Sequence, residues 1–120
     1  MNPSRGRAAE DAALRYLEAQ GCALVQRNYR CRLGEIDLVM RDGGSLVFVE
    51  VRARGSDAFG GAAASVGHGK QRRLSAAARH FLMTHPREAR LPARFDVVAI
   101  SGPDGENAMR WIRAAFDSAH

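Results

Sequence analysis

Two carboxylates interrupt the apolar segments near the middle of the chain, Asp37 in the first segment and Glu50 in the second. The segments flank Gly43-Gly44, and valine, leucine and phenylalanine around a Gly-Gly pair are typical of a β-hairpin. Pairing centred on this turn brings residues 37 and 50 nearly opposite each other. A buried carboxylate is costly without a partner, and a metal ion is one candidate. Two carboxylates facing across a hairpin can hold one hard divalent ion such as Mg²⁺, which keeps several waters.

The two residues after Glu50 extend this candidate site. Arg52 lies on the same strand face as Glu50, where its guanidinium could hold a phosphoryl oxygen or a developing negative charge. The backbone carbonyl of Val51 is a further candidate ligand. A metal ion held here would polarise a phosphate and lower the pKa of a bound water. The simpler alternative is a structural ion pair between Glu50 and Arg52, which is the commoner reason for such residues.

Two more acidic residues lie in the expected strands. Glu35 shares a strand face with Asp37, and is either a supporting group of the site or the partner of a nearby arginine. We favour the arginine. Asp96 is expected to pair with Arg94 or another arginine, outside the site.

The pattern of apolar residues predicts an α/β domain that positions these side chains. Two segments have helical spacing, and strand-like segments occur between and after them. The expected elements are a helix at 5–20 ended by Gly21, strands at 22–29, 35–40 and 46–54, a helix at 70–84, and a strand at 94–100. Residues 109–116 fit a closing strand or a short helix, and residues 55–69 form a glycine-rich loop. This order predicts one mixed sheet flanked by helices in a single domain, residues 1–120.

The composition suits a small folded protein with a polyanionic partner. The 120 residues, 46% of them hydrophobic, are enough for one core, and the formal net charge is +5 with a pI of about 10.2. Arginine binds phosphate through two parallel hydrogen bonds, which favours a nucleic acid. The alternative is a basic protein whose arginines reflect Arg-rich coding. The candidate nucleic-acid-contacting residues are Arg30, Arg32, Arg54, Arg72 and Arg73.

The start of the second expected helix is strongly basic. Lys70, Gln71, Arg72 and Arg73 load its first turn with positive charge, which opposes the helix dipole. An anion such as phosphate docking there would explain the placement. The alternative, that these side chains simply point into solvent, has equal weight.

The sequence also argues against a membrane protein and against a zinc-binding protein. No apolar stretch approaches the roughly 20 residues that span a bilayer, and the first residues lack the apolar region of a signal peptide. We therefore expect a cytoplasmic protein with no membrane partner. Cys22 and Cys31 are not part of the four-ligand set that zinc needs, so both are expected to serve as small apolar residues.

Four sequence blocks resemble the YraN-like family of small bacterial proteins. The blocks are GEIDL at 34–38, VFVEVRAR at 47–54, Lys70-Gln71 and RFDVV at 94–98. That family is similar to the PD-(D/E)XK nuclease superfamily, in particular to archaeal Holliday-junction resolvases. The resemblance covers nearly the whole chain and implies a restriction-endonuclease-like αβββαβ core.

The resemblance also implies an activity and a site. The activity is phosphodiester hydrolysis in DNA that depends on Mg²⁺ or Mn²⁺, with Asp37 and Glu50 as the core of the site. It further suggests supporting roles for Glu10 on the first helix, and for Lys70 and Gln71 on the second. From spacing alone Glu10 is a solvated residue at the flank of that helix or one that reaches the site.

One position departs from the superfamily pattern. Arg52 stands where that pattern usually has lysine, which can lose a proton and help to activate water, whereas arginine effectively cannot. Arg52 could still orient water or neutralise phosphate, or Lys70 could reach in from its helix. Two hypotheses follow: a nuclease acting on DNA, with branched DNA as a candidate substrate, or a nucleic-acid-binding module without catalysis. A resolvase-like substrate would favour a homodimer, because a four-way junction needs two symmetric cuts.

Overall fold

The computed structural model describes residues 3–54, 66–101 and 108–117, and its elements follow the predicted order. They are α1 (Pro3–Ala19), β1 (Ala23–Cys31), β2 (Gly34–Asp42), β3 (Ser45–Arg54), α3 (His68–Thr84), the short 3₁₀ helix η1 (Glu88–Arg90), β4 (Ala93–Ser101) and β5 (Ala108–Phe116). The predicted α/β class with an αβββαβ core is confirmed. The last segment, for which the sequence allowed a strand or a helix, is the strand β5.

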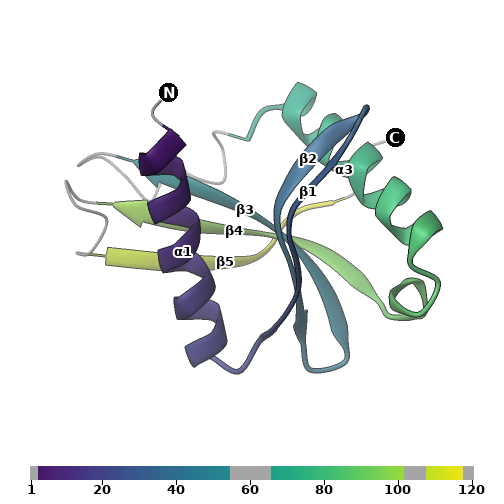
Figure 1. The fold of residues 1–120 in the computed structure, drawn as a ribbon, viewed down its shortest axis with the longest axis horizontal. Helices are drawn as coiled ribbons and strands as arrows, with labels where there is room; N and C mark the ends of the chain where they lie inside the picture. The colour runs from purple at the N-terminus through teal and green to yellow at the C-terminus, as the bar shows by residue number, and fades with distance from the viewer. Residues whose placement is uncertain (1–2, 55–65, 102–107, 118–120) are drawn as a thin grey trace.

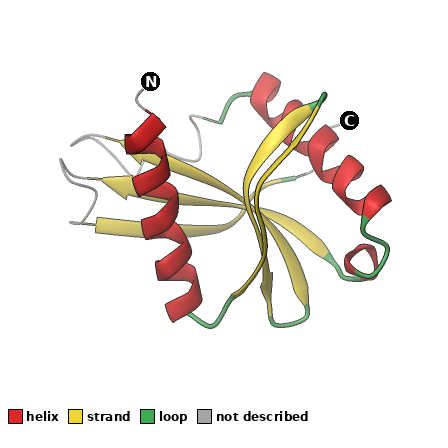
Figure 2. Ribbon diagram, in the orientation of Figure 1, coloured by secondary structure: helices red, strands yellow, loops and turns green. Residues whose placement is uncertain are grey.

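Five strands form one mixed sheet in the order β1-β2-β3-β4-β5. The strands are yellow in Figure 2, with the helices in red. Neighbouring strands are antiparallel except β3 and β4, which are parallel. A parallel pair needs a crossover connection, and α3 lies in the chain between these two strands. Asp42 pairs with Ser45 across the β2–β3 turn, as the predicted register requires. Gly43 has a φ of 61° there, which glycine adopts at little cost.

Two hydrophobic clusters lie on opposite faces of the sheet, and one helix packs on each (Figure 1). Leu17 of α1 packs in the cluster that contains Val47 of β3. Phe81 of α3 packs in the other cluster, edge-to-face against Phe48 of β3. Successive side chains of a strand point to opposite faces, so β3 contributes to both layers in turn. Glu50 follows Phe48 on the α3 side, where the strand face changes from apolar to charged as predicted.

Helix α1 ends in a hydrogen-bonding pattern that confirms Gly21 as its terminating residue. Gly21 has a φ of 99°, and its N–H donates to the carbonyl of Glu18 at 3.0 Å. The next N–H, of Cys22, donates to the carbonyl of Leu17 at 3.0 Å. These two bonds form a Schellman motif, in which a glycine at the left-handed position lets the last carbonyls find donors. Leu17 and Cys22 are both buried in the α1-side cluster.

The β1–β2 hairpin is longer than the sequence predicted. β1 runs to Cys31 and β2 begins at Gly34, so only Arg32 and Leu33 form the turn between them. The predicted strands stopped at 29 and restarted at 35. Polar and charged residues in this segment hid the pairing, which extends beyond the part of the hairpin that is buried in the core.

Helix α3 begins at His68 rather than at Lys70, directly after Gly67, which is extended. His68 and Gly69 are poor helix formers, which is why the sequence pattern placed the start later. Arg72 and Arg73 therefore lie beyond the first turn, and the predicted first turn of 70–73 is wrong. Of the predicted loop 55–69, residues 55–65 lie outside the described residues.

The described residues bear on two expectations, the one about membrane-spanning segments and the one about the cysteines. No helix there is long and apolar enough to cross a membrane. Both cysteines are free thiols: Cys22 is buried in the core, and Cys31 is partly buried against the α3-side cluster. This agrees with their expected role as small apolar residues.

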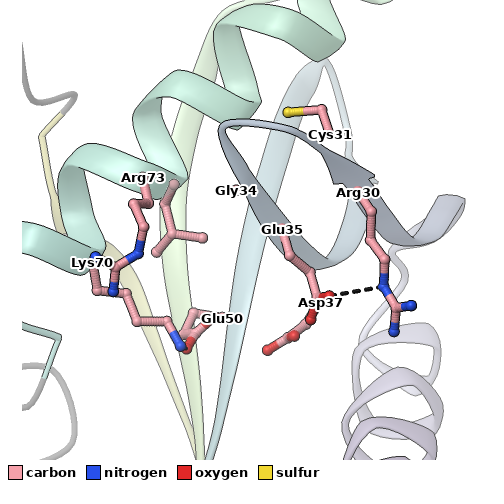
Figure 3. Close-up of a pocket in the computed structure, with 9 residues that line it drawn as sticks. Arg30, Cys31, Gly34, Glu35, Asp37, Glu50, Lys70 and Arg73 are labelled. Carbon is pink, nitrogen blue, oxygen red and sulfur yellow. Dashed lines mark ion pairs between the residues drawn. The ribbon is translucent and has the colours of Figure 1, made fainter.

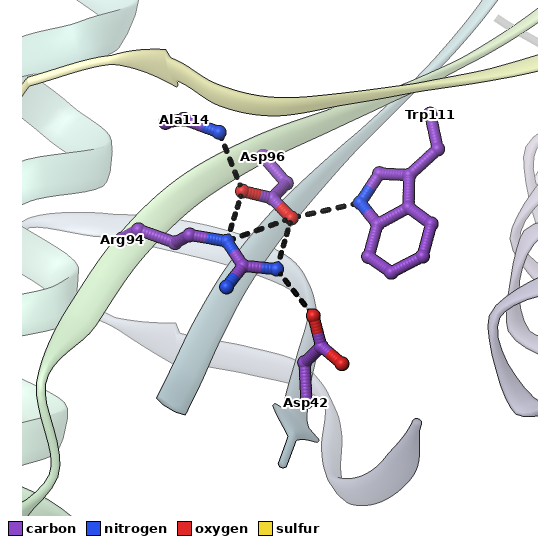
Figure 4. A network of polar contacts seen from close by, with 5 residues as sticks. All are labelled: Asp42, Arg94, Asp96, Trp111 and Ala114. Atoms are coloured by element: carbon purple, nitrogen blue, oxygen red, sulfur yellow. Dashed lines mark hydrogen bonds and ion pairs between the residues drawn. The ribbon is translucent and has the colours of Figure 1, made fainter. Parts of the chain in front are cut away.

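Asp96 on β4 is the centre of a buried polar network (Figure 4). Its carboxylate is fully buried and accepts hydrogen bonds from Arg94 Nε at 3.0 Å and from Trp111 Nε1 at 2.8 Å. The backbone N–H of Ala114, at a bulge in β5, donates at 2.9 Å. Arg94 also contacts Asp42 of β2 at 2.7 Å. The predicted pairing of Asp96 with Arg94 is confirmed, and the network links three strands.

Candidate functional site

The β2–β3 hairpin brings Asp37 and Glu50 together. The pairing of these strands runs from Asp42↔Ser45 to Leu38↔Val49, and one further step in the same register places residue 37 opposite residue 50. Pairing stops at that step, and the backbone N–H of Val51 donates to Asp37 Oδ2 at 2.9 Å. The Asp37 carboxylate thus takes the place of a strand carbonyl where β2 leaves β3.

Val51 faces the opening between the two strands. In an antiparallel pair, the N–H and the C=O of a hydrogen-bonded residue point to the same neighbour. Because the Val51 N–H reaches Asp37 of β2, its carbonyl is turned toward β2 as well. The described β2–β3 pairing ends before this residue, so the ladder does not use that carbonyl.

The two carboxylates repel each other electrostatically. Glu50 is 4% exposed, on the face that α3 covers. Burial and the neighbouring Glu50 charge raise the pKa of Asp37 from 3.8 to about 8, against the opposing effect of the Val51 N–H, and Glu10 adds to the rise. Two acids in contact cannot both ionise cheaply in a partly dry site, so the pair favours a proton or a cation between its oxygens.

Two basic side chains neutralise Glu50. Lys70 Nζ, from the first turn of α3, lies 2.7 Å from Glu50 Oε2. Arg52 Nη1 lies 3.5 Å from the same oxygen, too far for a strong hydrogen bond. The ion pair between Glu50 and Arg52 that the sequence allowed is therefore present, but Lys70 is the closer partner. Figure 3 shows Lys70 reaching Glu50 from the helix.

An open cavity of about 420 Å³ lies over these groups, between α3 and the β1–β2 hairpin (Figure 3). Its wall includes a tight backbone contact, because a Cβ on Gly34 would lie only 2.7 Å from the carbonyl oxygen of Arg73. Only glycine permits α3 to approach β2 so closely. The residues that line the cavity are Arg30, Cys31, Gly34, Glu35, Asp37, Glu50, Lys70, Arg73 and Leu74.

The predicted nucleic-acid-contacting arginines divide into three groups. Arg30 and Arg73 line the cavity. Arg32 and Arg72 are exposed and are not among its lining residues. Arg54 ends β3, but its side chain is outside the described part of the structure. Of the four arginines whose side chains the structure describes, Arg30 and Arg73 adjoin the carboxylate pair.

The three residues predicted to support the site differ in what they contact. Glu35 lines the cavity and pairs across the hairpin with Arg30, its Oε2 lying 2.8 Å from the arginine Nε, which agrees with the partner that we favoured. Gln71 donates through Nε2 to the Val66 carbonyl at 2.7 Å, so it braces the start of α3. Glu10 approaches from α1, where its Oε1 lies 3.6 Å from Arg27.

The sequence reasoning missed Arg27 and Gly34. Arg27 on β1 binds both Asp11, at 2.7 Å, and Glu10, and so fastens α1 to the sheet beside the site. An arginine within an expected strand carried no signal of this contact. Gly34 opens the GEIDL block, and its role depends on Arg73, far along the chain.

The oxygen donors of this site fit a hard divalent cation. Asp37 and Glu50 supply carboxylate oxygens, and the Val51 carbonyl faces the same opening. The described residues contain no group of three or more His, Cys, Asp and Glu side chains that could hold a metal ion. A set of two carboxylates suits Mg²⁺ or Mn²⁺, which keep waters and take substrate oxygens, better than it suits zinc.

Comparison with known proteins gives a consistent result. A family model described as uncharacterised protein family UPF0102 matches residues 9–100. A UPF0102 protein of Ralstonia nicotianae is 60% identical over 116 residues, which cover 92% of this chain and 85% of the relative. One from Nitrosomonas europaea is 53% identical over 97% of this chain and 96% of the relative. One from Legionella pneumophila is 45% identical over 98% of each. The resemblance carried by the four sequence blocks is thereby confirmed, and the chain belongs to the UPF0102 family, also called the YraN family.

Proposed function

We propose that this protein is a metal-dependent nuclease that hydrolyses phosphodiester bonds in DNA with Mg²⁺ or Mn²⁺. The observation that carries the proposal is the contact between Asp37 and Glu50 where β2 leaves β3, with Lys70 reaching in from α3. An acid whose pKa is strongly raised by burial and by a neighbouring acid, in an open cavity, is typical of a functional site, and Asp37 is such a group. A cytoplasmic location would give such an enzyme access to DNA.

Asp37, Glu50 and the Val51 carbonyl would hold the ion. When bound, such an ion supplies Lewis acidity and a more acidic water. Within the chain, the Val51 N–H orients Asp37 by donating to Oδ2. Burial under α3 keeps Glu50 in place.

Lys70 is the candidate for proton transfer. Its ammonium lies in the cavity, 2.7 Å from Glu50, and a lysine can give up a proton where an arginine cannot. It would thus replace the lysine that the superfamily pattern has at the position of Arg52. Arg52, beside the same carboxylate, would neutralise phosphate.

The positive charges at the rim of the cavity favour a polyanionic substrate. Arg30 and Arg73 line it from opposite sides, one on the β1–β2 hairpin and one on α3. The ion pair of Arg30 with Glu35 is largely exposed, so it is weak and can yield to a phosphate. The net charge of +5 agrees with a polyanionic substrate.

Cleavage assays with labelled single-stranded, duplex and branched DNA in Mg²⁺ or Mn²⁺ test the proposal. We expect Asp37→Asn and Glu50→Gln to abolish cleavage, and Lys70→Ala to slow it about 10²-fold or more. Glu35→Gln is the matched control, because Glu35 lines the same cavity but pairs with Arg30. Cleavage that persists in Asp37→Asn would overturn the site assignment. If branched DNA is preferred, sedimentation should show a homodimer.

A second candidate is a nucleic-acid-binding module without catalysis. Two cations, Lys70 and Arg52, already lie at Glu50, and this observation favours a site that is neutralised without metal. This candidate predicts DNA binding that weakens steeply with salt and is unaffected by Asp37→Asn. It also predicts no heat on titration with Mn²⁺, whereas the nuclease must bind the ion.

A further inference from the structure

The tip of the β1–β2 hairpin presents an apolar side chain beside the cavity. Cys31 pairs with Gly34, and Arg32 and Leu33 form the turn between them. Leu33 is 49% exposed and follows two exposed arginines, Arg30 and Arg32. A single exposed leucine is ordinary by itself. This one is notable for its position, because the residues on both sides of the turn, Cys31 and Gly34, line the cavity over the carboxylate pair.

The tip is held rigidly against α3. The backbone of Gly34 lies so close to the carbonyl of Arg73 that a Cβ would not fit. Lower in the hairpin, the hydroxyl of the buried Tyr29 hydrogen-bonds to His80 of α3. Leu33 is therefore carried by a strand end that is fixed at two points, and its place relative to the cavity is set by the fold.

The neighbouring groups limit what Leu33 can contact. A nucleic acid whose phosphate reached Asp37 and Glu50 would pass near the hairpin tip, because Cys31 and Gly34, on the two sides of the turn, line the same cavity. Arginines hold phosphates regardless of base sequence, but a leucine has no favourable contact with a phosphate. The apolar surface of a nucleic acid is on the faces of its bases, which a stacked duplex covers. Leucine is among the side chains that proteins insert between base steps.

We infer that Leu33 is a wedge that contacts unstacked bases next to the phosphate bound in the cavity. The substrate class is therefore nucleic acid with unpaired or easily opened bases at the cleavage position, rather than a perfect duplex. This inference rests on the proposed function, because it takes the cavity to be the phosphate site. It adds a specificity-determining residue that touches no metal or phosphate.

Binding of fluorescently labelled DNA by the full chain, in metal-free buffer that prevents cleavage, tests this inference. Two probes of one sequence are compared, an intact duplex and a duplex with two central bases unpaired. We expect Leu33→Ala to weaken binding of the unpaired probe about fivefold, the value expected for losing burial of the exposed half of a leucine. Binding of the intact duplex should change less than about twofold, with an unaltered salt dependence.

Met83→Ala is the matched control, because Met83 is 81% exposed on α3 and does not line the cavity. It should leave both affinities unchanged. Leu33→Lys is a second variant, which should strengthen duplex binding and remove the preference for unpaired bases. Equal effects of Leu33→Ala on both probes, or none on either, would overturn the inference. Titration of Mn²⁺ into Leu33→Ala separates the two claims: normal ion binding with no change in probe preference leaves the nuclease proposal standing and rejects the wedge.

Discussion

Two groups of carboxylates lie on the same sheet, one fully buried and one at the cavity, and their hydrogen-bond and ion-pair partners differ. Asp96 is fully buried, and its oxygens accept bonds from the Arg94 guanidinium, the Trp111 indole and the Ala114 N–H. The partners of the Asp37–Glu50 pair are the Val51 N–H, the partly exposed Lys70 and, at 3.5 Å, Arg52. A single acid with a full set of donors stabilises the fold. Two neighbouring acids, one of which has a raised pKa and the other of which is paired with partly exposed cations, form a site that a metal ion would stabilise.

The largest loss of stability should follow from removing the Asp96 carboxylate, whose oxygens have a full set of donors. Asp96→Ala removes the acceptor for three donors and leaves the partly buried Arg94 with Asp42 as its remaining partner among the described residues. We expect the free energy of unfolding to fall by about 3–5 kcal/mol, measured by urea denaturation. A loss below about 1 kcal/mol would mean that this network is not structural and that the contrast between the two groups is unfounded.

A substitution at the contact between the β1–β2 hairpin and α3 should lower the stability by a smaller amount. Gly34→Ala places a methyl group against the Arg73 carbonyl, so α3 must shift from β2. We expect a loss of about 1–3 kcal/mol in unfolding free energy and slower cleavage, because Lys70 moves with the helix. Gly44→Ala is the control: a Cβ there meets nothing within 4 Å, and its stability should change by less than about 0.5 kcal/mol.

The dependence of stability on pH distinguishes the strained pair. The folded pKa of Asp37, about 8, lies above its unfolded value of 3.8, so protonation favours the folded state. The stabilising contribution is present below about pH 4 and is lost as the pH rises to about 8. Without metal, Asp37→Asn should therefore have nearly the stability of the native chain at about pH 4 and should be more stable by at least about 1 kcal/mol at about pH 8. Parallel stability curves for the two proteins would contradict this origin of the strain.

Much of the fold and the core of the site followed from local patterns. The Gly43-Gly44 turn set the register that opposes residues 37 and 50, and alternation along β3 placed Glu50 and Arg52 on one face. Asp96 and Arg94 are two residues apart on one strand, so their pairing was also predictable. Such features depend on neighbours in the chain or on a single turn.

The rest depended on contacts between distant segments. The reach of Lys70 to Glu50 requires the crossover helix to lie against β2, and that position depends on the contact of Gly34 with Arg73. The closing strand was ambiguous for a local reason. The bulge in β5, where Ala114 has a φ of 50°, breaks the alternation that marks a strand.

Titration calorimetry with Mn²⁺ tests the central claim most directly, using the native chain, Asp37→Asn and Glu35→Gln at one pH above 8. We predict that the native chain and Glu35→Gln bind a single ion with similar affinity, and that Asp37→Asn weakens binding at least about tenfold, since it removes a charged ligand. Equal binding by the native chain and Asp37→Asn would contradict the account, because the ion would then lie elsewhere. Absence of binding by the native chain would reject the metal site and favour the non-catalytic module.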